Sequence, residues 1–114
     1  MAFLLIFRLD DGLFSEQESL RQFESIGVTD VERSSMPGAA VTGHFHHLSD
    51  SVIVEIKSDF KTIAISDSGP AGFEFAWRFQ GATTTPLRMV DEAYSFDVEL
   101  SDIHSMKELR TAIQ

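Results

Sequence analysis

Two segments of the chain alternate apolar and polar residues with a period of two. Aromatic side chains fall on one side of the pattern in residues 73–79, and aromatic or aliphatic side chains do so in residues 94–100. Strict alternation over this length is typical of a β-strand that buries one face. The two segments are therefore predicted to be half-buried strands that supply the core face of a sheet through Phe73, Phe75, Trp77, Phe79, Tyr94, Phe96, Val98 and Leu100.

The segment from Phe3 to Leu9 is apolar on both sides of the same period. Leu4 and Ile6 lie on one side, and the remaining apolar residues lie on the other. A strand with two apolar faces is typical of the centre of a sheet, where both faces are covered. We therefore expect a central, doubly covered strand that ends at Asp10.

Shorter runs predict the remaining strands. Residues 52–57 and 62–66 alternate and are separated by a short polar turn, which predicts a hairpin. Successive hairpins indicate an antiparallel sheet. A short strand is expected at 28–33, and edge strands are expected at 41–47 and 86–90.

Two segments carry the signature of an amphipathic helix with a capped start. Ser15 with Glu18, and Ser105 with Glu108, have the spacing of a capping box, in which each residue bonds a free backbone amide of the other. Apolar residues then recur at helical spacing, and Gly27 follows the first segment. The predicted helices span about residues 16–26 and 106–113.

These elements predict an α+β fold, with an antiparallel β-sheet and two amphipathic helices. The 114 residues suit a single domain, 1–114, because the chain has no internal repeat or linker. Cysteine is absent, so disulfides and thiolate metal sites are excluded. The apolar opening is too short for a membrane span and lacks the basic start of a signal peptide, so a cytoplasmic location is expected.

Acidic residues outnumber basic ones by 18 to 9, which gives a net charge of −9. Nucleic-acid backbones and anionic lipids bind through Lys and Arg, so neither a nucleic acid nor a membrane is expected as a partner. An acidic surface keeps a protein soluble, and it also attracts a basic protein over a distance. Both interpretations of the charge remain open.

The acidic residues gather in two parts of the chain. The C-terminal group has no Lys or Arg within it, whereas the N-terminal group is partly offset by Arg21 and Arg33. If a basic partner binds, we expect one of these groups to meet it. The candidate partner-binding residues are Asp91, Glu92, Asp97, Glu99 and Asp102 in the first group, and Glu16 and Glu24 in the second.

Three residues could bind a metal ion. On a strand, His44 and His46 would lie on one face, and Asp50 follows closely as a third ligand. Two exposed histidines on an edge strand give the same pattern, so we expect neither a metal nor another cofactor. No serine lies in a nucleophile elbow and no glycine-rich phosphate loop is present, so we expect no enzymatic activity.

The C-terminal stretch at residues 86–113 reads PLRMVDEAYSFDVELSDIHSMKELRTAI. It resembles the ends of small bacterial immunity proteins of polymorphic toxin systems, including contact-dependent growth inhibition. The resemblance covers about a quarter of the chain. It implies an inhibitor that binds and neutralises a cognate toxin, a basic nuclease being the expected class, in the producing cell. The alternatives are a general protein-interaction module and a metal-dependent enzyme built on His44 and His46.

Overall fold

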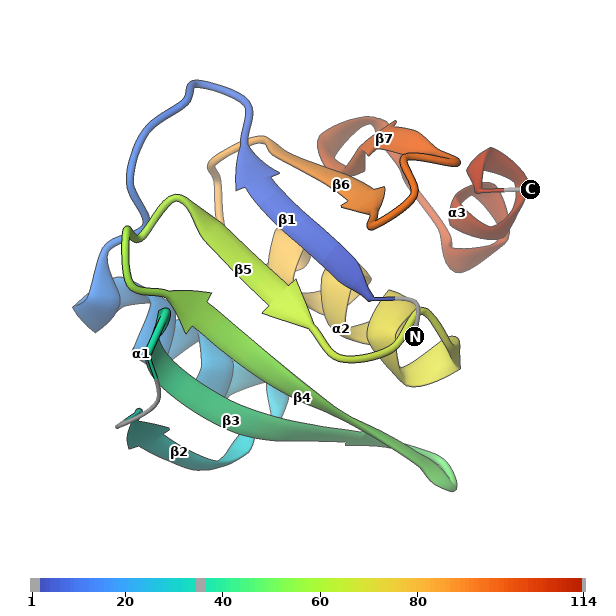
Figure 1. The fold of residues 1–114 in the computed structure, drawn as a ribbon. Helices are drawn as coiled ribbons and strands as arrows, with labels where there is room; N and C mark the ends of the chain where they lie inside the picture. Colours follow the sequence, from blue (N-terminus) through green and yellow to red (C-terminus); the bar gives the residue numbers. More distant parts are fainter. Residues whose placement is uncertain (1–2, 35–36, 114) are drawn as a thin grey trace.

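The computed structural model describes residues 3–34 and 37–113 (Figure 1). An antiparallel sheet and α-helices are both present, so the predicted α+β class is confirmed. In chain order, the described elements are β1 (Leu4–Arg8), α1 (Glu16–Ile26), β2 (Thr29–Arg33), β3 (Ala39–His47), β4 (Asp50–Lys57), β5 (Thr62–Ile65), α2 (Pro70–Gly81), β6 (Leu87–Asp91), β7 (Asp97–Glu99), the 3₁₀ helix η1 (Leu100–Asp102) and α3 (Met106–Ala112).

The seven strands form one sheet in the order β2-β3-β4-β5-β1-β6-β7, and each neighbouring pair is antiparallel. The first strand of the chain lies inside the sheet, between β5 and β6, as its two apolar faces predicted. The expected edge positions of residues 41–47 and 86–90 are wrong. β3 lies between β2 and β4, and β6 lies between β1 and β7, so β2 and β7 form the edges.

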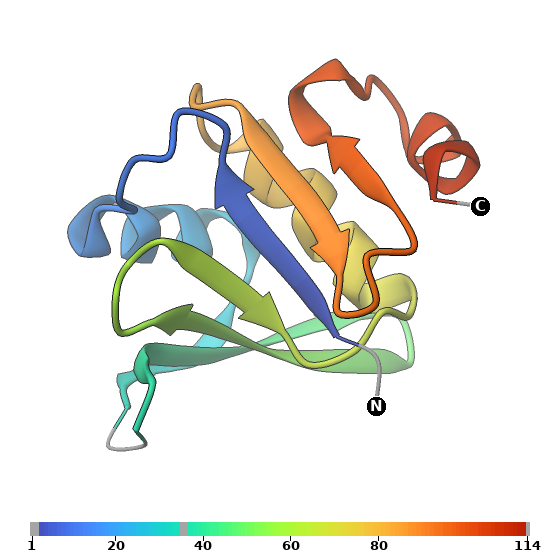
Figure 2. The ribbon, with the colours of Figure 1, turned by 45° about the horizontal axis from the view of Figure 1, so that its top comes forward.

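Both long helices lie on the same face of the sheet, behind the strands in the view of Figure 1. Figure 2 shows α2 passing behind β6, while α1 lies farther to the left, towards the other half of the sheet. The short helix α3 lies beside the β7 edge. No described helix covers the second face of β1, so the expectation of a strand covered on both sides is wrong within the described residues.

Helices α1 and α3 begin where the capping boxes predicted. The Ser15 hydroxyl accepts a hydrogen bond from the Glu18 amide at 3.3 Å, and Gly27 ends α1 with a φ of +94°. The Ser105 hydroxyl likewise accepts from the Glu108 amide at 3.1 Å. A polar cap satisfies a backbone amide that has no partner within the helix, so both starts are fixed by local chemistry.

Residues 73–79 are not a strand, because they form most of helix α2. Pro70 occupies the start of the helix, where its missing amide costs nothing. Residues two apart are 200° apart around a helix, so alternating aromatics fall into two i,i+4 pairs. Phe75 and Phe79 are buried in the core, and Phe73 and Trp77 are half-buried beside it. The described residues therefore form three α-helices where two were expected.

The predicted strand at 94–100 shrinks to β7, the three residues Asp97–Glu99. The segment before it forms a turn, in which Tyr94 has a φ of +53° and is 68% exposed. The Asp91 carboxylate accepts hydrogen bonds from the Ser95 amide and hydroxyl, which closes this turn. Val98 and Leu100 are buried as expected, whereas Tyr94 does not contribute to the core.

The core lies between the sheet and the two long helices. Four phenylalanines form its aromatic centre, with ring centroids 5.5–5.7 Å apart in each contacting pair. Stacked and edge-to-face rings at this spacing are favourable beyond the area they bury. These rings come from α1 (Phe23), β3 (Phe45) and α2 (Phe75 and Phe79).

Candidate functional site

The face of the sheet that carries no helix is the candidate functional site, and we call it the open face. Side chains alternate between the two faces of a strand. In β1, Leu4 and Ile6 are fully buried towards the helices, while Leu5 and Phe7 point to the open face and are half-buried. The open face therefore has an apolar centre that no described helix covers.

Strand register extends this apolar centre sideways. Leu5 lies opposite Ala64 of β5 on one side and Val90 of β6 on the other. Ile53 of β4, 43% exposed, belongs to the same face. The apolar residues therefore form a band across four adjacent strands.

Two hollows lie on this band. The larger, which we call the trough, has a volume of about 540 Å³ and contains Phe7, Thr62 and Val90, with Tyr94 and Asp59 also lining it. The smaller, of about 290 Å³, is lined by residues that include Phe3, Ile53 and Ala64. The open face is thus uneven and partly apolar, which suits insertion of side chains from another protein.

Charged side chains surround the apolar band, and some of them neutralise one another. The Arg88 guanidinium donates two hydrogen bonds to the Asp97 carboxylate across β6 and β7. Lys57 pairs with Glu55 at 3.1 Å. Around this face, four described carboxylates have no ion-pair partner: Asp11, Asp59, Glu92 and Glu99. The described lysine near them that also has no ion-pair partner is Lys61.

The C-terminal group of candidate residues does not form one continuous acidic patch. Arg88, from the neighbouring strand, lies within it and lowers the pKa of Asp97 through its hydrogen bonds. Hydrogen bonds from Ser95 lower the pKa of Asp91, so that carboxylate is ionised and holds the turn. Glu92, Glu99 and Asp102 are exposed and have no ion-pair partner among the described residues.

The N-terminal candidates lie on the other side of the molecule. Glu16 and Glu24 belong to α1, which covers the helical face of the sheet (Figure 2). Glu16 forms an ion pair of 3.5 Å with Arg33 of β2, while Glu24 is exposed. A partner on the open face would therefore not contact this group.

The three candidate metal ligands are not brought together. His44 lies 3.5 Å from Asp30, and His46 is exposed. Asp50 has a different role, because its carboxylate accepts a hydrogen bond from the Ala71 amide at 3.2 Å and so caps the start of α2. The described residues contain no group of three His, Cys, Asp or Glu side chains placed to hold a metal ion.

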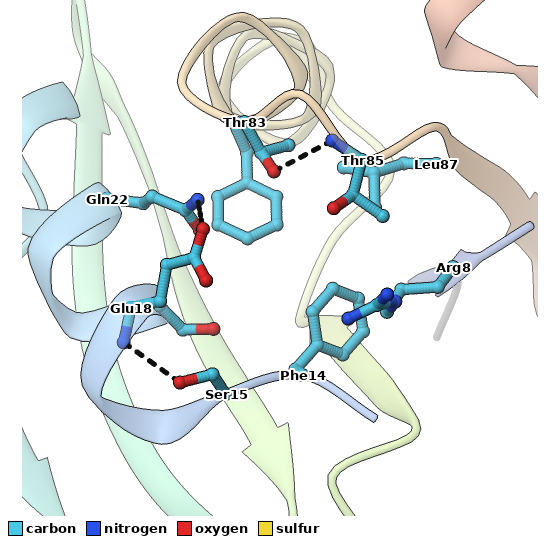
Figure 3. Close-up of a pocket in the computed structure, with 10 residues that line it drawn as sticks. Arg8, Phe14, Ser15, Glu18, Gln22, Thr83, Thr85 and Leu87 are labelled. Atoms are coloured by element: carbon cyan, nitrogen blue, oxygen red, sulfur yellow. Dashed lines mark hydrogen bonds between the residues drawn. The ribbon is translucent and has the colours of Figure 1, made fainter. Parts of the chain in front are cut away.

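A narrow polar crevice lies between the start of α1 and the end of α2 (Figure 3). Gln22 donates to Glu18 on one side, and the Thr85 amide donates to the Thr83 hydroxyl on the other. The crevice holds about 20 Å³, which is room for roughly one water molecule. Its size excludes an organic substrate.

A second groove, which we call the end groove, lies outside the open face. It has a volume of about 540 Å³ and lies between the tip of the β3–β4 hairpin, the start of α2, the β6–β7 turn and α3. Phe73, Phe96, Met106 and Ile113 supply its apolar lining. No residue of the described ranges lines both the end groove and the trough, so the two hollows are separate surfaces.

No described helix is both long enough and apolar enough to span a bilayer. Comparisons of the chain with protein-family models, with curated proteins and with solved structures each found no match.

Proposed function

We propose that this protein is a binding protein that neutralises a basic toxin by docking it on the open face. The observation that carries the proposal is the position of β1. A strand this apolar on both faces is typical of one covered on both sides, yet helices cover only one side. A partner protein would complete the missing cover.

The charge around the open face supports a basic partner. Four described carboxylates without ion-pair partners surround the apolar band, and the whole chain carries a net charge of −9. A negative potential speeds the encounter with a cationic surface, and a desolvated apolar centre then slows release. An apolar centre with a charged rim is the usual arrangement of a protein interface.

The dimensions of the molecule are adequate for such an interface. A standard complex buries roughly 800 Å² on each partner. The molecule extends 36 × 34 × 27 Å, so the open face offers an area of that order.

The resemblance of residues 86–113 to immunity proteins supports a toxin as the partner, with a basic nuclease as the expected class. Under this proposal the protein acts in the cytoplasm of the producing cell, where it blocks the toxin before release. A general interaction module would use the same face, and the toxicity of the captured partner distinguishes the two functions.

The test is capture of the partner from the native cell with variants on opposite faces. Leu5→Thr replaces an apolar side chain at the centre of the open face and keeps a residue suited to a strand. Val31→Thr is the matched control, because Val31 is an exposed apolar residue of edge strand β2. We expect the wild type and Val31→Thr to retain a basic protein that Leu5→Thr releases.

The captured protein should also stop growth when expressed alone, and co-expression of this chain should restore growth. Equal capture by Leu5→Thr and wild type, once both are shown to be folded, would remove the open face as the binding site. A captured partner with no toxicity would instead indicate that this protein is a general interaction module.

A further inference from the structure

The tip of the β3–β4 hairpin carries an apolar side chain where stability alone would not place one. Leu48 is 91% exposed and has a φ of +57°. A two-residue turn joins the paired residues His47 and Asp50, and in such turns glycine or asparagine is preferred because a positive φ crowds a larger side chain. A strained, exposed leucine at a hairpin tip points to a contact outside the chain.

The end groove lies directly beside this tip, and Leu48 forms part of its rim. The Phe73 and Phe96 rings both line the groove and pack against each other, with centroids 6.2 Å apart. Met106, also half-buried, adds a flexible thioether that adapts to an incoming side chain. A projecting apolar residue and an apolar hollow are therefore neighbours on one surface.

The charges around the groove differ between its two sides. On the α3 side, Lys107 and Arg110 are exposed and have no ion-pair partner among the described residues. On the hairpin side, Asp67 is exposed and likewise has none, and the Asp50 carboxylate bonds only backbone amides. Glu108 of α3 is also exposed, and its carboxylate accepts a hydrogen bond from the His104 amide. The α3 side thus carries two cations against one carboxylate, whereas the hairpin side carries two carboxylates.

We propose that this surface binds a second copy of the same chain, with Leu48 of each copy inserted into the end groove of the other. A two-fold axis brings one patch against the same patch of its partner, so a projection and a hollow placed side by side complement each other twice. The same rotation places the basic α3 side of each copy against the acidic hairpin side of the other.

The net charge of −9 opposes this association at long range but not at contact. At an ionic strength of about 0.15 M, repulsion is screened beyond roughly 8 Å, whereas the apolar contact is unaffected. The dimer would leave the trough free, since no residue lines both hollows. The dimer contact therefore uses no residue that lines the trough, and its test does not depend on the function proposed for the open face.

The experiment measures the mass of the purified full chain by light scattering and sedimentation equilibrium. Concentrations from about 1 to 100 μM bracket a dissociation constant in the micromolar range. We expect the wild type to change from monomer to dimer over this range. Leu48→Gly should remain a monomer, and its melting temperature should equal or exceed that of the monomeric wild type, because glycine adopts a positive φ without crowding.

Two further variants distinguish this specific contact from nonspecific hydrophobic association. Leu13→Ala removes an exposed leucine, 56% exposed, from the opposite end of the sheet and should dimerise like the wild type. Met106→Glu places a charge in the groove and should weaken dimerisation at least tenfold. A wild type that stays monomeric throughout, or a Leu48→Gly variant that dimerises as well as the wild type, overturns the proposal. If the wild type stays monomeric, the candidate occupant of the groove is a different protein.

Discussion

Leu4 and Leu5 are neighbours in β1 that lie on opposite faces of the sheet. Leu4 is fully buried beneath α2, so closely that a Cβ atom added to Gly72 would lie 3.1 Å from the Leu4 Cδ1 atom. Leu5 lies on the open face between Ala64 and Val90. The same residue type therefore stabilises the core at one position and is available to a partner at the next.

This difference predicts that the same substitution acts mainly on stability at Leu4 and mainly on partner binding at Leu5. Leu4→Ala leaves a cavity in the core and should lower the free energy of unfolding by about 2–5 kcal/mol. Leu5→Ala removes less buried area and should cost about 1 kcal/mol, while weakening partner binding more than Leu4→Ala does. Urea denaturation of both variants measures the first comparison. A larger stability loss for Leu5→Ala would show that the open face is covered in the folded chain.

Two glycines of α2 provide a second matched pair. A Cβ atom at Gly72 would lie 2.4 Å from the Asp67 carbonyl oxygen, which is backbone and unable to move aside. Gly72→Ala should therefore cost about 1–3 kcal/mol or more, the usual effect of overpacking. At Gly81 the added atom meets nothing within 4 Å, so Gly81→Ala should be neutral or stabilise by up to about 1 kcal/mol. Thermal and urea denaturation test both, and equal effects would contradict this packing.

Local patterns predicted much of the fold because their causes are local. The start of each capped helix depends on one serine and the amide three residues later, and the hairpin of β4 and β5 depends on two alternating runs with a turn between them. Helix α2 was missed because alternating aromatics satisfy a strand and a helix equally well. Gly69 followed by Pro70 at the helix start, and the small residues Ala71, Gly72 and Ala76 against the sheet, were the available signals.

The candidate site was harder to predict because strand pairing creates it. The run from Asp91 to Asp102 contains no base in sequence, yet Arg88 reaches Asp97 once β6 and β7 pair. The sequence also predicted correctly that β1 has two apolar faces, but not that the helices would cover only one of them. That outcome depends on where α2 packs, and the alternating pattern of residues 73–79 predicts a strand in place of α2.

The stability of the folded state should depend on pH in the acidic range through Asp10, which lies in the loop after β1. Arg8 donates two hydrogen bonds to this carboxylate, at 2.9 and 2.7 Å, and the Gly12 amide donates a third. These bonds, chiefly those from Arg8, lower the pKa of Asp10 from 3.8 to about 2. The folded state thus holds the charged form more strongly than the unfolded chain does. The stabilisation is fully present above pH 3.8 and is lost as the pH falls to about 2.

The corresponding measurement compares wild type with Asp10→Asn. The wild type should have the higher urea midpoint at neutral pH, and the difference should shrink between pH 3.8 and about 2, where the wild-type carboxylate becomes protonated. A difference that stays constant through this range would show that the Asp10 charge contributes nothing to the fold.

The acidic residues near the open face should control how fast a basic partner binds. Glu92 and Glu99 are exposed and have no ion-pair partner in the described chain, so reversing them removes negative potential without breaking a hydrogen bond or an ion pair, although Glu99 lies opposite Arg88 in the register of β6 and β7. Asp97 is a poorer choice, because its reversal would also break the ion pair and the two hydrogen bonds that Arg88 forms with it. The control is Glu16→Lys with Glu24→Lys, an equal charge change on α1 behind the sheet.

Glu92→Lys with Glu99→Lys should lower the association rate on the order of tenfold at low salt, since steering acts before contact is made. The dissociation rate should change little if both side chains lie at the rim of the interface. The α1 variant should bind faster than the open-face variant, although its net charge is the same. Stopped-flow or surface-plasmon measurements at about 0.05 and 0.3 M salt test this, because the higher salt screens the field to within roughly 6 Å. If both variants bind like wild type at both salt concentrations, the acidic residues serve solubility and do not guide a partner to the open face.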